Sequence, residues 1–557
     1  IQGPDTIGFL YELTNALALN GLHIAHVSVA STGNRIHDTL YITDTRGEKI
    51  VDREKQRELR AATVLVKHFT HLLPYASNPE TALSHFHEFL GQLFARPHWP
   101  DELASLERPE VLNALAQLLG VSDFLWDDFL RMQHENLFPV VQDVASFPHA
   151  KMKPELAHEL DGVLFKTSEV AGHDERGSFR SEAPVSLQPR QLPKSGHIST
   201  GDRHASWRDA MNEFKDREMF RIDMRNILGY IPNPAQFAAE LTDLAEVVIA
   251  ATVRLCQAEL EEQYGRPLRE DGEPSALTVV GLGKCGGREM GYASDIELMF
   301  IYDSNGQTSG PRLLTTTEYY ERLVQEVRKA IRTRHEGSFD LDLQLRPYGS
   351  AGSLAVSLAA FRRYFAPGGP AWSYERQALI KLRPICGEAA LGDQVQLLRD
   401  AYVYGGEPFD VPAMRAMRER QLRHLVTPGR INAKYSPGGL VDVEYLVQGL
   451  QINHGRDEPA LHLTNTQEAM AALAWLGILS QEHFTHLRAA HLFLQRLIDA
   501  LRVVRGHSKD LTVPRETDEE FAFLTRRMGY ANNQSLFSAD LADHIANVQM
   551  LNASLLG

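Results

Sequence analysis

Two stretches of alternating apolar and polar residues dominate the central part of the chain. Successive side chains of a strand face opposite sides, so residues two apart share a face. In Asp295–Tyr302, the side chains of Ile296, Leu298 and Phe300 therefore face one way, while Asp295 and Glu297 face the other. Phe339–Pro347 alternates in the same way, with Asp342 on its polar face. If the two strands pair, the pattern predicts carboxylates from both strands on one face of a sheet.

A glycine-rich turn lies between the apolar strand Leu277–Val280 and the first acidic strand. It contains Gly286 and Gly287, and Ser294 directly precedes the carboxylates. Backbone N–H groups of such turns can cradle phosphate, and carboxylates bind Mg²⁺. Two Mg²⁺ ions roughly 3.5–4 Å apart can activate an attacking oxygen and stabilise a leaving one. We interpret the region as a metal–nucleotide site; its structural alternative is a solvated strand face beside an ordinary turn.

Further candidates for phosphate contact follow the second acidic strand. Gly349 and Ser350 lie in a glycine-containing turn. Lys381 and Arg383 are two apart, so they share a face if their segment is extended. We predict that these four residues contact a triphosphate or pyrophosphate, with Arg376 as a weaker candidate. An ordinary loop and ordinary ion pairs are the structural alternative.

The N-terminal part predicts a small α/β unit. Its spacing of apolar residues indicates a helix, two strands and a second helix, over residues 7–19, 23–31, 36–43 and 52–67. Gly33-Asn34 between the strands is typical of a hairpin turn. Farther along, apolar periodicity predicts helices over residues 214–229, 239–265 and 317–335 and throughout 415–557.

Composition and charge narrow the classes of function. The chain has 557 residues and a net charge of −15, which argues against a nucleic-acid coat or a binder of anionic membranes. Its three cysteines show neither a disulfide framework nor zinc spacing, which fits a reducing cytoplasm. We find no signal peptide and no apolar run of the roughly 18–20 residues that span a membrane. The chain begins with Ile1, so we expect a fragment.

Several ordered blocks resemble the glutamine synthetase adenylyltransferase family, also called glutamate–ammonia-ligase adenylyltransferases. They cover residues 281–289, 294–298, 342–352, 372–384 and 436–448. The resemblance implies transfer of AMP from ATP to a tyrosine of glutamine synthetase, its removal by phosphorolysis, or both, with Mg²⁺ as cofactor. It implies that Asp295, Glu297 and Asp342 are the catalytic and metal-binding residues.

The resemblance also implies a domain order and a multidomain α+β fold. We expect an ACT-like unit, a helical segment, a linker-rich segment, a mixed-sheet nucleotidyltransferase domain with a helical lead-in, and a C-terminal helical bundle. The corresponding ranges are residues 1–68, 69–146, 147–204, 205–410 and 411–557. The later part of the linker-rich segment is expected to be mobile, because it is polar and holds several prolines.

Two positions depart from the family pattern. The family usually has Asp where this chain has Glu297, and usually Arg where it has Gln344. Glu also binds Mg²⁺, but its extra methylene shifts the carboxylate, and Gln344 removes one phosphate contact. Asp442 and Glu444 lie in the last family-like block. We expect them near the core, either in catalysis or at a domain interface.

The N-terminal unit resembles an ACT domain, a small-molecule sensor of amino-acid metabolism. The resemblance rests on Asp5, Gly8, a helix and a strand pair ending in TLYITD, with the usual first strand largely missing. It implies an amino-acid ligand near the first turn; a ligand-free packing module is equally compatible.

Other functions stay open at this point. One is a uridylyltransferase acting on the signal protein PII, which also joins a nucleotidyltransferase to ACT domains. Another is a non-catalytic regulatory half that senses an amino acid. Members of the adenylyltransferase family typically carry two cores, whereas we find one here, so the chain is half of such an enzyme or a single-core relative. The residues do not decide between adenylylation and its reversal.

Overall fold

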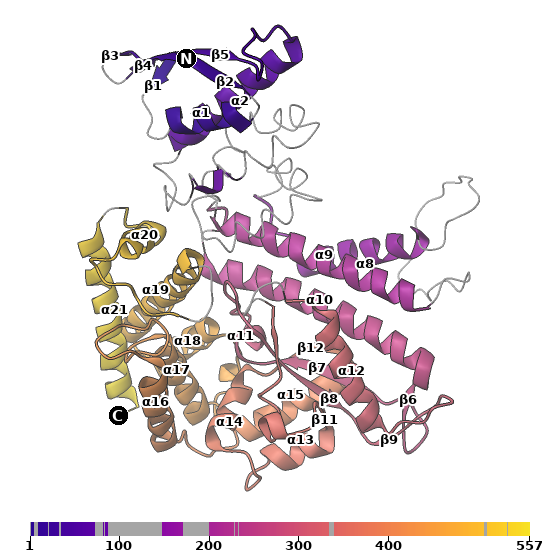
Figure 1. Ribbon diagram of the computed structural model, residues 1–557. Helices are drawn as coiled ribbons and strands as arrows, with labels where there is room; N and C mark the ends of the chain where they lie inside the picture. Colours follow the sequence, from indigo (N-terminus) through magenta and orange to yellow (C-terminus); the bar gives the residue numbers. More distant parts are fainter. Residues whose placement is uncertain are drawn as a thin grey trace.

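The computed structural model describes residues 2–4, 9–19, 22–32, 35–72, 82, 84–86, 88, 148–170, 200–227, 229–231, 233–333, 339–505, 510–531 and 533–556. Its architecture is α+β, with a mixed sheet next to several groups of helices (Figure 1). The expected fold class is therefore confirmed at this level. The ACT-like identity of the N-terminal unit stays a prediction.

The N-terminal unit has helices and strands in the predicted regions, but each of the two predicted strands is divided in two. The elements are β1 (Gln2–Pro4), α1 (Phe9–Leu19), β2 (His23–Ser28), β3 (Ser31–Thr32), β4 (Arg35–His37), β5 (Thr39–Thr43) and α2 (Arg53–Leu72). Strand β2 pairs antiparallel with β5, and β3 with β4. A three-residue strand, β1, precedes α1 and pairs with β4. The resemblance residues Asp5 and Gly8 lie outside the described residues.

The expected helical segment 69–146 lies almost wholly outside the described residues. The next segment, which we predicted to be rich in linker, begins with helix α8 (Lys153–Val170). Leu156 and Leu160 are four apart, so they share one face of this helix, and both are buried. This apolar face explains why a segment with scattered prolines is helical here. Residues 171–199, with most of the predicted mobile linker, are not described.

Two long helices lead into the sheet. Helix α9 spans Thr200–Ile227, and α10 spans Pro234–Tyr264. Asn233 caps α10 by accepting a hydrogen bond from the Ala235 amide. We expected an amphipathic, charged α9, but several of its charged residues are buried. They are buried as pairs, because an unpaired buried charge is strongly destabilising; the guanidinium of Arg225, for example, donates two hydrogen bonds to Glu240, at 3.0 and 3.1 Å.

The central sheet has five strands. They are β7 (Leu277–Gly281), β8 (Ile296–Tyr302), β10 (Leu341–Asp342), β11 (Ala355–Ser357) and β12 (Arg383–Gly387). The order is β10-β8-β7-β12, and β11 also pairs with β8. Strand β7 runs antiparallel to β8 and β12, whereas β10 and β11 run parallel to β8. A two-stranded ribbon of β6 (Pro267–Arg269) and β9 (Gly306–Thr308) lies beside helix α12 (Thr316–Ala330).

The predicted pairing of the two acidic strands is confirmed, with Asp342 directly opposite Glu297. The second strand is much shorter than its alternating pattern suggests, because only two residues of it pair. After Asp342 the chain turns, and the buried guanidinium of Arg346 donates to the carbonyl oxygens of Leu343 and Gly352, at 2.5 and 3.2 Å. The alternation in Phe339–Pro347 predicts instead that Arg346 shares the polar strand face of Asp342.

Helices cover both faces of the sheet. Phe300 packs in one hydrophobic core with α10 and α12 (Thr316–Ala330). Met299 and Ile301 pack in another with α13 (Leu358–Phe365) and α15 (Ala389–Val403). The predicted helix over residues 317–335 is therefore confirmed in type, with its end earlier, at Ala330.

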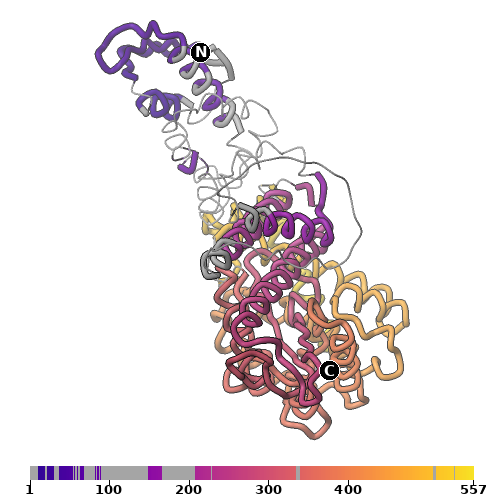
Figure 2. The backbone as a smooth tube through the Cα atoms, turned by 90° about the vertical axis from the view of Figure 1, so that its right-hand side faces the viewer, coloured from indigo at the N-terminus to yellow at the C-terminus, as the bar shows by residue number. Residues whose placement is uncertain are grey.

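The C-terminal part is helical, as predicted, and has its own hydrophobic core. Its main helices are α16 (Val411–Leu425), α17 (Leu440–His454), α18 (Thr466–Trp475), α19 (Gln481–Arg505), α20 (Glu519–Arg527) and α21 (Gln534–Leu555). Together they form a bundle beside the sheet domain (Figures 1 and 2). Within the described residues, we find no helix with the length and apolar character needed to span a bilayer.

Candidate active site

The three predicted carboxylates lie at one edge of the sheet. Asp295 immediately precedes β8, Glu297 is the second residue of β8, and Asp342 ends β10. Burial raises the pKa of Asp295, and the carboxylates of Asp340 and Asp342 raise it further. Burial and Asp342 likewise raise the pKa of Glu297. The charge of Asp342 therefore acts on both of the other predicted carboxylates.

These carboxylates do not converge on one point in this conformation. Across the described ranges, no three His, Cys, Asp or Glu side chains are gathered closely enough to hold a metal ion by themselves. A Mg²⁺ ion, however, is often held by one or two carboxylates together with water and substrate phosphates. The oxygen donors at this edge of the sheet therefore fit a metal that binds with its nucleotide.

The glycine turn holds Glu297 in place. Residues Gly283–Gly286 form a single helical turn, α11, and Gly283 has a φ of 47°. The Lys284 amide donates to Oε2 of Glu297 at 3.1 Å. A Cβ on Gly283 would lie 1.2 Å from the same oxygen. Glycine is thus required at 283 both by the backbone conformation and by the close approach of the carboxylate.

Gly286 and Gly287 have a packing role in the structure, whereas we predicted phosphate contact. Their amides donate within the turn, to the carbonyl oxygens of Leu282 and Gly283, at 2.8 and 3.0 Å. A Cβ on Gly286 would lie 1.8 Å from the Lys381 carbonyl oxygen, so only glycine fits. Ser294 is buried, and its Oγ accepts a hydrogen bond from the Gly291 amide at 2.9 Å. Ser294 therefore shapes the loop that precedes Asp295.

Lys381 lies in the 3-10 turn η4 (Leu379–Lys381), so the expected extended segment and shared face with Arg383 are wrong. Its ammonium group is buried and lies 2.7 Å from Oε2 of Glu289. It also donates to Oγ1 of Thr466 at 2.7 Å. Because Thr466 begins α18, this contact joins the sheet domain to the helical bundle.

We expect Lys381→Met to lower the free energy of unfolding by about 3–5 kcal/mol, because it leaves a buried Glu289 carboxylate without its cation. Equilibrium denaturation at neutral pH measures the change. The matched control adds Glu289→Gln to the same chain, which removes the buried charge and is expected to restore part of the loss. A Lys381→Met chain that keeps full stability but loses nucleotide affinity would instead support the predicted phosphate contact.

The pair of Lys381 and Glu289 also predicts that the free energy of unfolding depends on pH. Burial opposes ionisation of Glu289, but attraction to Lys381 and His491, together with hydrogen bonds from Lys381 and the Thr466 amide, outweighs it and lowers the pKa of the carboxyl. A carboxyl whose pKa is lowered by folding stabilises the fold above its ordinary pKa and loses that contribution as the pH falls below it. The stability difference between the parent chain and Lys381→Met/Glu289→Gln should therefore shrink in acid.

Arg383 is also paired within the protein. It lies in β12, and its guanidinium donates to the carbonyl oxygens of Gly286 and Cys285 at 2.9 and 3.0 Å. It forms an ion pair with buried Glu246 of α10, which also pairs with Lys153 of α8. Arg383 therefore links the glycine turn to helix α10 of the helical lead-in. The phosphate contact that we predicted for it stays a prediction.

The predicted turn with Gly349 and Ser350 forms the short 3-10 helix η3 (Gly349–Ala351). Arg346 donates to the Ser350 carbonyl oxygen at 3.4 Å, which closes the turn on itself. The described lining of the large cavity beside the acidic strands includes neither Gly349 nor Ser350. Their predicted phosphate contact is therefore without support from this arrangement.

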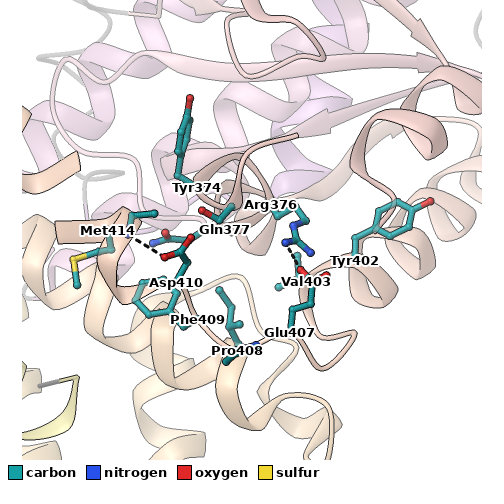
Figure 3. A pocket seen from close by; sticks show the side chains of 13 residues that line it. Tyr374, Arg376, Gln377, Tyr402, Val403, Glu407, Pro408, Phe409, Asp410 and Met414 are labelled. Carbon is teal, nitrogen blue, oxygen red and sulfur yellow. Dashed lines mark hydrogen bonds and ion pairs between the residues drawn. The ribbon is translucent and has the colours of Figure 1, made fainter. Parts of the chain in front are cut away.

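Arg376 belongs to a separate, small cavity of about 30 Å³. In Figure 3 its guanidinium, on helix α14 (Ser373–Ala378), points toward Glu407, with which it forms an ion pair. Arg376 is thus paired within the protein, and the phosphate contact that we predicted for it stays a prediction. Its neighbour Glu375 accepts hydrogen bonds from the Tyr364 hydroxyl at 3.0 Å and the Trp372 amide at 2.8 Å.

A larger cavity of about 480 Å³ opens between the acidic edge of the sheet and the helical bundle. Its lining includes charged residues from both domains, namely Lys284, Glu289, Glu297, Arg346, Glu375, Lys381, Lys434 and Glu444. It also includes apolar and amide side chains, among them Leu282, Leu345, Phe365, Gln377, Leu379, Met417 and Gln448. This volume and mixed lining are typical of small-molecule sites.

The two acidic residues of the last family-like block have different positions. Asp442 accepts hydrogen bonds from Arg418 at 2.6 Å and from the Gly438 amide at 2.7 Å, so it stabilises the bundle. Glu444 lines the large cavity, and burial raises the pKa of its carboxyl. Lys284 and Lys434 were not among our predicted site residues. Both lie within or beside motif blocks that we had recognised, which is the signal that could have identified them.

A glycine turn, carboxylates on two neighbouring parallel strands and a cavity lined by lysines are features typical of a nucleotidyltransferase domain. Residues 184–397 match the family model of glutamate-ammonia ligase adenylyltransferase. This match, which covers less than half of the chain, agrees with the resemblance seen in the sequence. Residues 413–556 match a second family model, GlnD PII-uridylyltransferase.

Curated relatives agree with the first match. A bifunctional glutamine synthetase adenylyltransferase/adenylyl-removing enzyme of Stenotrophomonas maltophilia is 34% identical over 357 residues, covering 63% of this chain and 37% of that protein. Its counterpart in Pasteurella multocida is 31% identical over 318 residues, covering 55% and 32%. The chain therefore matches only about a third of the length of these relatives.

Proposed function

We propose that the chain is an adenylyltransferase that moves AMP between ATP and a tyrosine of glutamine synthetase, or removes AMP from it by phosphorolysis. The observation that carries this proposal is the pairing of β8 and β10, which sets Asp342 opposite Glu297 beside the glycine turn. The family match over the same residues supports adenylyl rather than another nucleotidyl transfer.

The large cavity suits a nucleotide. Its apolar and amide lining provides contacts for a base, whereas its charged part provides carboxylates and lysines near one another. Asp295 and Glu297 would hold Mg²⁺ together with the phosphates, and Asp342 would complete the set. When bound, the metal supplies charge stabilisation at the transferred phosphoryl group.

The protein's own residues position the reactants and move one proton. The tyrosine oxygen attacks the α-phosphorus of ATP, and the bond to pyrophosphate breaks, so the electron pair leaves with pyrophosphate. Asp342 accepts the tyrosine proton. Positioning and charge neutralisation supply most of the rate enhancement in transfers of this kind.

Incubation with labelled ATP, Mg²⁺ and purified glutamine synthetase tests the proposal. Label on the synthetase identifies an adenylylating core. A parallel reaction contains adenylylated synthetase and phosphate, where ADP formation identifies the removing core. If neither reaction occurs although ATP binds, the chain is a regulatory or incomplete half, and the proposed activity is wrong.

A uridylyltransferase acting on PII is the second candidate, favoured by the match of residues 413–556 to the corresponding family model. That region forms one wall of the cavity, whereas the acidic strands belong to the adenylyltransferase match. Labelled UTP with PII in the same assay separates the two, because label on PII would favour this candidate.

The N-terminal unit holds a cavity of about 250 Å³ with a mixed lining that includes Leu13, Leu17, Asp38 and Thr63. We infer that an amino acid is its ligand, as the ACT-like sequence suggests. Calorimetric titration of the whole chain with single amino acids tests this, and absence of binding for all of them would leave a packing module.

A further inference from the structure

Two lysines, one from each domain, line the large cavity beside the acidic strands. Lys284 lies in the glycine turn α11, and Lys434 lies in the loop before α17. Both line the cavity together with Glu297. In the part of the chain that the structure describes, no carboxylate lies within 4.0 Å of either ammonium group. They differ in this from Lys381, Arg383 and Arg376, whose charges are paired.

The loop that carries Lys434 is firmly held. The side chain of Asn432 accepts hydrogen bonds from the amides of Lys434 and Tyr435, both at 3.0 Å. Arg418 donates to the Tyr435 carbonyl oxygen, also at 3.0 Å. The Lys434 ammonium lies 5.0 Å from the centre of the Tyr435 ring. Lys434 is therefore positioned by the bundle and not by a metal or nucleotide.

The charges around the cavity are complementary to a phosphate group bound with its metal. Burial raises the pKa of Asp295 and of Glu297, and the positive charge of Lys434 offsets part of this rise. Burial, together with repulsion from Arg502 and Lys434, lowers the pKa of Lys284 to about 8. An anion between the lysines would relieve this repulsion, and lysine is a common point-charge ligand of phosphate.

We propose that Lys284 and Lys434 bind the phosphoryl oxygens beyond the α-phosphorus, so that the helical bundle completes the nucleotide site of the sheet domain. The ligand is the pyrophosphate part of ATP in adenylylation, or inorganic phosphate in the reverse reaction. The inference rests on the proposed function, because it assigns residues to the leaving or attacking group of that reaction. It adds two lysines to Lys381 and Arg383, which we had predicted for this contact.

Calorimetric titration of the intact chain with ATP, AMP and inorganic phosphate, each with Mg²⁺ and without a protein substrate, tests the proposal. Lys434→Met and Lys284→Met are each expected to weaken ATP binding at least about tenfold, the loss of one charge-assisted contact. AMP binding should change less than about twofold, since AMP lacks those phosphates. Weakened binding of free phosphate would assign the subsite to phosphorolysis as well.

Two further variants control for folding and for charge. Lys434→Arg keeps the positive charge and is expected to bind ATP within about threefold of the parent chain. Lys329→Met removes a lysine that is 68% exposed on α12 and is not part of the cavity lining. Its affinities for ATP and AMP should equal those of the parent chain. Thermal unfolding of all variants confirms that each is folded.

Equal weakening of ATP and AMP, or unchanged ATP affinity in Lys434→Met, would overturn the inference. A chain that adenylylates glutamine synthetase with an unchanged KM for ATP in Lys434→Met would keep the proposed function and lose the inference. A chain that binds ATP through both lysines but transfers no AMP would keep the inference and lose the proposed function.

Discussion

Asp295→Asn is expected to reduce AMP transfer to glutamine synthetase by about 10³-fold, the size of effect seen when one electrostatic contact to a transition state is removed. Asp295 is exposed at the start of β8 and shares the acidic edge with Glu297 and Asp342. Asn keeps the shape of the side chain but not the charge that would hold the metal. Initial rates with labelled ATP at saturating Mg²⁺ measure the effect.

Asp340→Asn is the matched control for this prediction. Asp340 is an exposed neighbour whose charge raises the pKa of Asp295, but the partner of Glu297 across the strands is Asp342. We expect its loss to reduce the rate by no more than about tenfold. An Asp295→Asn chain with full activity would show that the acidic edge is not catalytic, which favours a regulatory half.

Gly283→Ala is expected to lower the transfer rate by about 10²-fold, because it displaces the Glu297 carboxylate from the amide of Lys284. The added Cβ would lie 1.2 Å from Glu297 Oε2, and the backbone φ of 47° disfavours alanine in any case. A residue held in such a conformation costs about 1–3 kcal/mol of stability. Kinetics and denaturant unfolding of the same preparation measure both effects.

Gly272→Ala separates the two causes. Gly272 also has a positive φ, of 85°, but a Cβ there would meet no atom within 4 Å. This variant should lose a similar amount of stability while keeping its transfer rate. If Gly283→Ala loses stability only, Glu297 does not depend on the glycine turn, and our account of the turn is wrong.

Local patterns predicted the acidic edge of the sheet well. The alternation in Asp295–Tyr302 placed Ile296, Leu298 and Phe300 opposite Asp295 and Glu297, and the structure buries all three apolar side chains. Such patterns work because a strand presents successive residues to opposite sides regardless of its partners. The same rule failed for the residues after Asp342, where Arg346 finds buried carbonyl partners that no alternation rule foresees.

The contacts of the cationic residues depend on partners that are distant in the sequence. Lys381 and Arg383 have the spacing of phosphate ligands, but Glu289, Thr466 and Glu246, which are far away in the chain, bind them. A buried charge is stable only with a partner, and which partner it meets depends on the packing of whole domains. Spacing alone cannot supply that information.

The sequence by itself determined the family resemblance, the helical and strand-forming segments and the pairing of the two acidic strands. These depend on local periodicity and on ordered motifs. Only the tertiary structure decided which lysines lie near the carboxylates, because Lys284 and Lys434 line one cavity although they belong to different domains. The contact between domains is set by the complementary packing of their surfaces, and side-chain packing of that kind is a property of the folded chain.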